Sequence, residues 1–506
     1  MLGNTFQSAD NAALASKILQ YGYRWMIEDH YGFLINIYVK LFTAALSMAG
    51  IALTEFWWKV PIALVGSLQV PIVYLFLLRL RCQQSTALTG AAILAILPIH
   101  VMQSRYPWGY EVLGVLFVTL AIWALLDFYE DPTPKTGLRA SLMLGLYLIS
   151  HGYIVPFGVC LFAMAILFGQ GRGADKVKRI IRGLKLFFQK YVWVFPALFF
   201  PIYLSSLQYT FSKKSQLGFY FESHFPGFVE NIGIFITGSI VASIVISLLN
   251  KKISSKKAWF FLLAGAAYLA PLFFGSPPHV TVERGYMLMG TYFWLILVCI
   301  VFDAFVRRKK RFVYALAVIS LTATFMGTID SVFGRDQWFD PAFVTSERGD
   351  VPPDPGSKAA GYLLRTYLPD SIRVLALNRA IEPPVLYYYF RRSDYAYYDV
   401  SNQTLCEIFQ FMRDSVDVVI SCKANMPVVQ ADSLFEQRIV LYSENRPRLW
   451  IFAKPGIRLP QLESDVKPLN RAFDREFPNR VSLRLAHYFN RIMHTTNSEK
   501  SQHESN

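Results

Sequence analysis

Charged residues are scarce in this chain, because Asp, Glu, Lys and Arg make up only 17% of its 506 residues. Soluble globular proteins carry about 25% charged residues, so the scarcity excludes an ordinary soluble enzyme. Hydrophobic residues make up 54% of the chain, and uncharged runs such as 60–78, 140–171 and 191–212 are long. Each run is sufficient to cross about 30 Å of hydrocarbon. The sequence therefore predicts that most of the protein lies in a lipid bilayer.

Cysteine is also rare, and five cysteines are too few for a disulfide scaffold. Cys82, Cys160 and Cys299 lie in or beside apolar runs, where cysteine behaves as a small hydrophobic residue. Cys406 and Cys422 fall in the more polar C-terminal part, where either a disulfide or a free buried pair is compatible with the sequence. The absence of a CxxC motif or a Cys/His spacing excludes the common zinc sites.

The chain has no basic patch interleaved with aromatic residues, the pattern typical of a nucleic-acid groove. Its net charge of +15 comes from 50 Lys and Arg against 35 Asp and Glu. These cations gather at alternate ends of the apolar runs, which is the pattern that orients membrane proteins. We therefore interpret the surplus as topology and expect no nucleic-acid partner.

Ten membrane spans are predicted from the apolar runs. Loops on one side of this arrangement carry 20 Lys and Arg and loops on the other carry 4, so the first side is predicted to be the inside. The residues after Asp330 are then extracytoplasmic. The predicted spans are 60–78, 86–103, 110–127, 139–153, 154–170, 191–211, 231–250, 258–275, 285–305 and 312–330.

The uncharged stretch 140–171 is long for one helix and short for two. Both loops that flank it carry inside charge, so the chain must cross the bilayer twice here. The turn is expected near His151, Gly152, Tyr153 and Pro156, between two short or tilted helices.

The N-terminal region differs from the spans, because Lys40 interrupts its apolar stretch. A lysine at the centre of a span is costly in lipid. We therefore expect residues 8–21 and 32–50 to form helices that lie on the outer membrane surface, with Met1 outside the membrane.

The fold class predicted is a polytopic α-helical membrane protein with a C-terminal extracytoplasmic α/β domain. Residues 1–56 form the juxtamembrane helices with an acidic motif, 57–330 the transmembrane domain, 331–350 a linker, 351–457 the α/β domain and 458–506 a polar, basic tail.

The α/β domain is predicted to hold a mainly parallel sheet, because helical and strand patterns alternate along it. Helices are expected at 357–367, 382–391 and 402–413, and strands at 372–377, 395–400, 416–421, 438–442 and 448–453. No GxGxxG follows its first strand, so nothing indicates a dinucleotide. In the tail, an apolar helical stripe is predicted from Val481, Leu485, Tyr488, Phe489 and Ile492.

Ionisable residues at the outer ends of the predicted spans are candidates for function, because charge in lipid is rare without a task or a partner. Carboxylates and cations at one membrane face suit a reaction that deprotonates a hydroxyl and neutralises a phosphate leaving group. The candidates are Asp10, Glu28, Asp29, His30, Lys59, Arg105, Tyr106, Tyr110, Glu111, His279, Glu283, Arg284 and Tyr286.

Several segments resemble GT-C fold glycosyltransferases of the dolichyl-phosphate-mannose protein mannosyltransferase and lipid A aminoarabinose transferase type. In the N-terminal half they are Ser8-Ala9-Asp10-Asn11-Ala12, His30-Tyr31-Gly32-Phe33-Leu34, Lys59-Val60-Pro61 and the stretch from Pro98 through Ser104-Arg105-Tyr106 to Tyr110. Further on, Glu283-Arg284-Gly285-Tyr286 resembles the Arg/Tyr segment before a late span, and residues 384–391 resemble part of the family's C-terminal domain.

The resemblance implies transfer of a sugar from a polyprenyl-phosphate donor to an acceptor hydroxyl on the outer face, usually with inversion. Asp10 would act as the general base or orient the acceptor, and Lys59, Arg105 and Arg284 would hold the donor phosphate. Glu28 and Asp29 would supply a second acid or a divalent cation site. The substrate cavity would be lined by His30, Tyr106, Tyr110, Glu283 and Tyr286.

The chain departs from the family pattern at two places near its start. The family commonly has a second acid directly after the first, where this chain has Asn11. The family also has a span before the acidic motif, whereas Met1 stands nine residues before Asp10, so a misplaced start or a truncated gene is expected.

Other interpretations of the same residues stay open. Asp10 could cap a surface helix, Glu28 and Asp29 could be an exposed loop pair, and Arg105 and Arg284 could reach phospholipid headgroups. At the level of the whole chain, the alternatives are a transporter or flippase of a lipid-linked saccharide and a non-catalytic assembly protein. The partners expected are a lipid-linked sugar donor and membrane lipids, the predicted location is a bacterial inner membrane, and the sequence does not name the acceptor.

Overall fold

The computed structural model places two compact units, which are described here separately. Within them the structure describes residues 33–51, 53, 55–104, 110–151, 154–168, 176–212, 232–250, 255–275, 287–307, 311–333, 355–369, 371–377, 395–396, 402–421, 426–443, 446–460 and 481–485.

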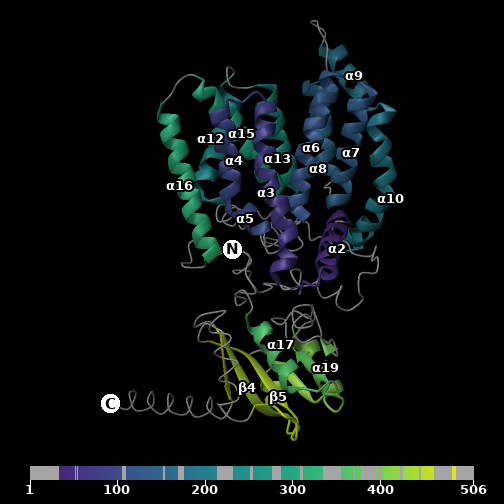
Figure 1. Cartoon of the computed structure of the whole chain (residues 1–506), viewed down its shortest axis with the longest axis vertical. Coiled ribbons are helices and arrows are strands. Elements are labelled where there is room, and N and C mark those ends of the chain that lie inside the picture. The colour runs from purple at the N-terminus through teal and green to yellow at the C-terminus, as the bar shows by residue number, and fades with distance from the viewer. Residues whose placement is uncertain are drawn as a thin grey trace. The chain divides into compact units, whose positions relative to one another are not determined.

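The first unit is a bundle of helices (Figure 1). All ten predicted spans fall on helices, the second of them on the pair α4 and α5, which Pro98 separates. The helices are α2 (Phe33–Met48), α3 (Glu55–Arg79), α4 (Gln84–Ile96), α5 (Pro98–Gln103), α6 (Tyr110–Glu130), α7 (Pro134–His151), α8 (Ile154–Phe168), α9 (Lys176–Phe187), α10 (Lys190–Ser212), α12 (Ile234–Leu249), α13 (Lys256–Gly275), α15 (Leu288–Val306) and α16 (Arg311–Phe333).

Three described helices are long and apolar enough, by length and composition, to cross a membrane: Phe56–Arg79, Glu111–Glu130 and Leu288–Val306. A fourth candidate is the pair formed by α9 and α10, which is bent by 48° between Phe187 and Lys190. The shorter apolar helices among the described residues are Phe33–Met48, Gln84–Ile96, Pro156–Phe168, Ile234–Leu249 and Ala317–Met326. The polytopic helical architecture is therefore confirmed, whereas the count of ten crossings stays a prediction.

The stretch 140–171 forms two helices, as predicted from its flanking charges. α7 packs against α6 and α10, and α8 packs against α13 and α9. The predicted turn at Gly152 and Tyr153 lies outside the described residues, between the last residue of α7 and the first of α8.

The helix predicted at 32–50 is α2, which packs against α3 and α7. Lys40 lies within it and is partly buried, and this burial lowers the pKa of the ammonium group. The helix predicted at 8–21 lies outside the described residues, and the surface position of both helices stays a prediction.

The cysteines of the helical unit are buried, as their apolar surroundings indicate. Cys82 lies between α3 and α4, where burial raises the pKa of its thiol to about 12. The thiol is therefore inert near neutral pH. The possible pairing of Cys406 and Cys422 falls outside the part of the chain whose side chains the structure describes.

The second unit is a six-stranded sheet with helices on both faces. Its strand order is β2-β1-β3-β5-β4-β6. The elements are α17 (Pro355–Tyr367), β1 (Val374–Leu377), β2 (Tyr395–Ala396), α19 (Asn402–Met412), β3 (Val418–Ser421), α20 (Met426–Gln430), β4 (Glu436–Ser443), β5 (Arg446–Ala453) and β6 (Val481–Leu485). The helix predicted at 382–391 lies outside the described residues.

The prediction of a mainly parallel sheet is wrong. β1 pairs in parallel with β2 and β3, but β5 pairs antiparallel with β3 and β4, and β4 pairs antiparallel with β6. Only residues 444–445 separate β4 from β5. A connection this short can join only antiparallel strands, because a parallel pair needs a crossover of a dozen or more residues.

The predicted helical stripe in the tail is wrong at its start, because residues 481–485 form β6. Val481, Leu483 and Leu485 alternate with the polar residues Ser482 and Arg484, which is the period of a strand. Since β6 pairs with β4 in the same sheet, the α/β domain extends past the predicted boundary at residue 457. Tyr488, Phe489 and Ile492 of the stripe lie outside the described residues.

The sheet has an apolar core on each face, because successive side chains of a strand point to opposite sides. On one face, Leu363 and Leu364 of α17 pack with Val418 and Ile451. On the other face, Phe409 of α19 belongs to the cluster that includes Val419 and Phe452. The predicted α/β class of this domain is confirmed.

Candidate active site

Two of the eleven predicted site residues lie on described helices. Lys59 is on α3 with 5% of its surface exposed, and Tyr110 is the first residue of α6, its side chain outside the description. The remaining nine lie outside the described residues, and their roles stay predictions: Asp10, Glu28, Asp29, His30, Arg105, Tyr106, Glu283, Arg284 and Tyr286.

The helices that carry Lys59 and Tyr110 run side by side in the same direction. The Gln69 amide of α3 donates a hydrogen bond to the carbonyl of Val112, near the start of α6. The other ends meet where Arg79, the last residue of α3, pairs with Glu130, the last residue of α6. We call the end where α3 and α6 begin the outer end and the opposite end the inner end, following the predicted topology.

Lys59 lies on the face of α3 that approaches the segment leading to Arg105. Lys59 and Gly66 are seven residues apart, which places them on one face of the helix and about 10 Å apart along its axis. A Cβ atom added to Gly66 would collide with Ser104 Oγ, so the side chain of Ser104 lies directly against the backbone of α3. Ser104 therefore lies against the face of α3 that carries Lys59.

Deeper along α3, Gln69 joins three helices through neutral hydrogen bonds. Its amide donates to Val112 of α6, and its carbonyl oxygen lies 2.9 Å from Nε2 of His100 on α5. Ser104 Oγ in turn donates to the His100 carbonyl at 2.7 Å. Gln69 and His100 are 1% and 3% exposed, so these bonds fix the outer ends of α5 and α6 without contact with solvent.

A second set of buried polar groups lies in the outer half of the bundle. The hydroxyl groups of Tyr147 on α7 and Tyr268 on α13 are 2.6 Å apart, and the Tyr147 hydroxyl also lies 3.6 Å from Met289 Sδ on α15. Glu111 of α6 is 1% exposed. We name Gln69, His100, Glu111, Tyr147 and Tyr268 the outer polar cluster.

An apolar cavity of about 380 Å³ lies beside this cluster, between α7, α8 and α10. Its volume is within the range of small-molecule sites, about 300–1,000 Å³. The ring of Phe157 lines the cavity and packs against the ring of Tyr147, with 4.3 Å between the ring centroids. A single aromatic ring therefore connects the outer polar cluster to the cavity. The cavity is lined by Leu144, Leu148, Phe157, Gly158, Leu161, Trp193, Pro196, Ala197 and Phe200.

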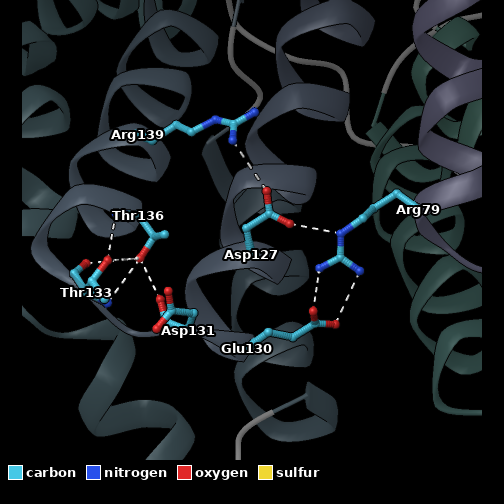
Figure 2. A network of polar contacts seen from close by, with 7 residues as sticks. All are labelled: Arg79, Asp127, Glu130, Asp131, Thr133, Thr136 and Arg139. Carbon is cyan, nitrogen blue, oxygen red and sulfur yellow. Dashed lines mark hydrogen bonds and ion pairs between the residues drawn. The ribbon is translucent and has the colours of Figure 1, made fainter.

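The inner end of the bundle is held by ion pairs (Figure 2). Arg79 of α3 donates to Asp127 at 2.9 Å and makes two bonds to Glu130, at 2.7 and 3.2 Å. Arg139 of α7 lies 3.5 Å from the other oxygen of Asp127. Two arginines and two carboxylates therefore tie α3, α6 and α7 together.

A second inner contact is centred on Asp303 of α15, which is 7% exposed. Its carboxylate accepts hydrogen bonds from the backbone N–H of Gln83 at 2.6 Å, from Thr86 Oγ1 at 3.2 Å and from Arg307 Nε at 2.6 Å. The same arginine donates to the carbonyl of Arg81, which adopts a left-handed φ of 65° in the turn between α3 and α4. This turn is thus fixed to α15.

The described residues contain no group of three or more His, Cys, Asp or Glu side chains that could hold a metal ion. The predicted second acid or metal site, Glu28 and Asp29 with Asp10, lies outside the described residues, and a divalent cation stays a prediction.

Sequence reasoning missed most of the outer polar cluster. Gln69, His100, Tyr147 and Tyr268 lie inside apolar runs, where a single polar residue is easily absorbed into a span. Their polar side chains could have indicated a buried contact, since an amide or imidazole within a membrane span needs a hydrogen-bond partner. Glu111, a candidate from the sequence, is 1% exposed at the start of α6.

Residues 35–198 match a family model described as dolichyl-phosphate-mannose-protein mannosyltransferase. No curated protein matches the chain in sequence.

Two solved structures are similar to the chain over most of its length. One is ArnT from Cupriavidus metallidurans bound to undecaprenyl phosphate, with a TM-score of 0.56, 11% identity, and coverage of 91% of this chain and 96% of that one. The other is the archaeal oligosaccharyltransferase AglB from Archaeoglobus fulgidus in complex with an inhibitory peptide and a dolichol-phosphate, with a TM-score of 0.52, 12% identity, and coverage of 90% and 72%. The predicted GT-C fold is confirmed by these similarities.

Proposed function

We propose that the chain is an integral membrane glycosyltransferase that moves a sugar from a polyprenyl-phosphate donor to an acceptor hydroxyl on the extracytoplasmic face. The GT-C fold and the match of residues 35–198 to a mannosyltransferase family support this class of enzyme. The two similar structures hold undecaprenyl phosphate and dolichol-phosphate, which supports a lipid-linked donor. One observation carries the proposal: a buried polar cluster at one end of the bundle adjoins an apolar cavity of about 380 Å³.

The transfer requires a base and a set of cations at the same place. Asp10 accepts the proton of the acceptor hydroxyl while the hydroxyl oxygen bonds to the anomeric carbon. The bond between that carbon and the phosphate oxygen breaks, and polyprenyl phosphate leaves with the added negative charge. Lys59, Arg105 and Arg284 stabilise this charge. Electrostatic stabilisation of this kind is usually the largest single contribution to lowering the barrier.

The arrangement of α3 supports a shared role for Lys59 and Arg105. Lys59 and Gly66 lie on one face of the helix, and Ser104 contacts α3 at Gly66. Arg105, the next residue in the chain, is proposed to contact the same phosphate as Lys59.

The outer polar cluster holds the helix ends in place around the site, with His30, Tyr106, Tyr110, Glu283 and Tyr286 as the proposed lining of the substrate cavity. The apolar cavity between α7, α8 and α10 receives isoprenoid units of the donor. Phe157 separates the two regions, so the polar head and the apolar tail of one lipid would have adjoining sites of matching chemistry.

In the cell, the enzyme works at a bacterial inner membrane with its C-terminal α/β domain outside the cytoplasm. This orientation is supported by the distribution of Lys and Arg over the loops. It places the outer polar cluster and the α/β domain on the side where acceptors of the cell envelope are found.

The test uses the purified full-length protein in detergent with a radiolabelled polyprenyl-phosphate sugar and an extract of envelope acceptors. A glycosyltransferase releases polyprenyl phosphate in proportion to the labelled acceptor formed, whereas a transporter releases none. Asp10→Asn should lower the rate by 100-fold or more, because a positioned base contributes about 10²–10⁴-fold.

The matched control for Asp10→Asn is Asp131→Asn, the same chemical change at an exposed residue of the inner end. This variant should keep full activity, and both variants should keep the unfolding temperature of the unmodified protein. Full activity of Asp10→Asn would remove Asp10 as the base, and failure of the unmodified protein to release polyprenyl phosphate from any sugar donor would remove the proposed enzyme class.

A further inference from the structure

Helix α9 is anchored to the inner end of the bundle along one side only. The Tyr129 hydroxyl of α6 donates to the carbonyl of Gly183 at 3.5 Å. Trp193 of α10 donates to the carbonyl of Phe187 at 3.0 Å, and the rings of these two residues pack edge to face. Gly183 and Phe187 are buried, so they mark the side of α9 that faces the protein.

A second side of α9 is apolar and exposed. Val177, Ile181 and Phe188 are 64%, 58% and 69% exposed. Phe188 directly follows α9 and continues its helical turn, because its N–H donates to the Leu184 carbonyl at 3.0 Å. The spacing of four and seven residues therefore places all three on one stripe. Large apolar residues gathered on an exposed stripe indicate a contact with lipid or with another protein.

The next stripe around the helix is basic. Lys178, Arg182 and Lys185 are exposed and follow spacings of four and three residues, which place them on one stripe of the helix. At the inner end of the bundle, Arg79 and Arg139 form ion pairs with carboxylates. Arg182 and Lys185 make no ion pair with the carboxylates of the described part of the chain.

The apolar stripe continues on the outside of the next helix. After the 48° bend, α10 exposes Val194 and Leu198, at 47% and 63%. These residues lie on a helix predicted to cross the bilayer, where an exposed apolar face contacts acyl chains. The stripe of α9 is therefore continuous with a surface that lipid covers, which favours lipid over a protein partner.

From these observations we infer that α9 is an interfacial helix that binds anionic phospholipids of the leaflet at the inner end of the bundle. Val177, Ile181 and Phe188 enter the acyl-chain boundary, and Arg182 and Lys185 contact headgroup phosphates beside them. A helix with adjacent apolar and basic stripes lies in the plane of the interface in this way. This site is independent of the proposed enzyme activity, because it lies at the opposite end from the outer polar cluster.

The first test measures lipid retention by native mass spectrometry of the purified protein titrated with POPG or POPC. R182Q/K185Q should weaken the binding of POPG by about tenfold or more, since each cation near an anionic surface contributes about fivefold, and should leave POPC binding unchanged. The matched control is K135Q/K256Q, which removes two exposed inner cations outside α9. Equal losses of POPG binding in the two double variants would overturn the proposal.

The second test places a probe on the apolar stripe. Ile181→Cys carrying an NBD label is reconstituted into POPC/POPG vesicles, with the unmodified protein labelled in parallel to measure the background from native cysteines. The NBD emission should be quenched by spin labels on the upper acyl chain and protected from aqueous iodide. Quenching by iodide without quenching by the lipid labels would show that the stripe lies in water or against a protein, and would overturn the proposal.

Discussion

The two ends of the helical bundle use different chemistry to hold the same helices together. At the inner end, guanidinium groups pair with carboxylates, as Arg79 does with Asp127 and Glu130. At the outer end, neutral groups bond to each other, as Gln69 does with His100 and Tyr147 with Tyr268. An ion pair uses both charged groups to hold the helices together, whereas a neutral hydrogen bond holds them without a charged group.

On the proposed function, we expect the inner end to be structural and the outer end to be functional. The distinction can be tested by substitutions at both ends, because stability and turnover should respond separately. The expected effects below decrease from the largest to the smallest.

Asp303→Ala should cause the largest loss of stability at the inner end, about 2–3 kcal/mol, because it leaves the buried Thr86 hydroxyl and the backbone N–H of Gln83 without their acceptor. Thermal unfolding in detergent measures the change, with Asp131→Ala at an exposed position as the control. Turnover of the folded fraction should be unchanged. A specific loss of turnover at full stability would show that the inner end takes part in the reaction.

Lys59→Gln should lower turnover about 100-fold, the usual loss when one stabiliser of transition-state charge is removed. Because Lys59 is 5% exposed, Lys59→Met is made beside it to separate charge from volume. Release of labelled polyprenyl phosphate measures both variants, and Lys59→Arg should recover part of the rate. Equal activity of all three variants would place Lys59 outside the site.

Gly158→Leu should raise the KM for the lipid-linked donor about tenfold and leave kcat unchanged, because the new side chain fills the apolar cavity that the isoprenoid units would occupy. A Cβ atom at Gly158 meets no atom within 4 Å, so the substitution should not disturb the helices. Gly238→Leu is the control, since Gly238 also has free space around it and lies on α12, away from the cavity. An unchanged KM in Gly158→Leu would place the tail elsewhere.

Tyr147→Phe and Tyr268→Phe should each cost about 1 kcal/mol of stability, the usual net contribution of one hydrogen bond. The two hydroxyl groups share one bond of 2.6 Å, so the double variant should lose less than the sum of the single losses. A double-mutant cycle on unfolding in detergent measures the coupling. Fully additive losses would show that the two tyrosines are held by separate partners.

The sequence is sufficient to predict the helices of the ten spans and the helix at 32–50, because each of these apolar runs is long. Loop charge even separates α7 from α8, where hydropathy alone leaves one continuous run. Helix α9 is not predicted, because basic residues interrupt its apolar pattern. Strand pairing is harder to predict, because pairing depends on connections. The alternation of helices and strands predicts a parallel sheet, but the two-residue link between β4 and β5 permits only an antiparallel pair, and Val481 and Leu485 fit both a helical stripe and the strand that the structure shows.

The candidate site was predictable only where charge marks it. Lys59 is a candidate from the sequence because a cation beside an apolar run is unusual. The structure places it nearly buried on α3. Gln69 and His100 gave no comparable signal, since their importance comes from a bond between residues 31 positions apart in the chain. Such a contact is set by how α3 and α5 pack, which local periodicity does not contain.

The missing side chain at position 66 allows the end of α5 to approach α3 closely. Even a methyl group there would collide with Ser104 Oγ and with Ser104 Cβ, and would force Ser104 away from α3. The closeness of these two helices therefore depends on a residue that carries a hydrogen atom where every other amino acid carries a carbon.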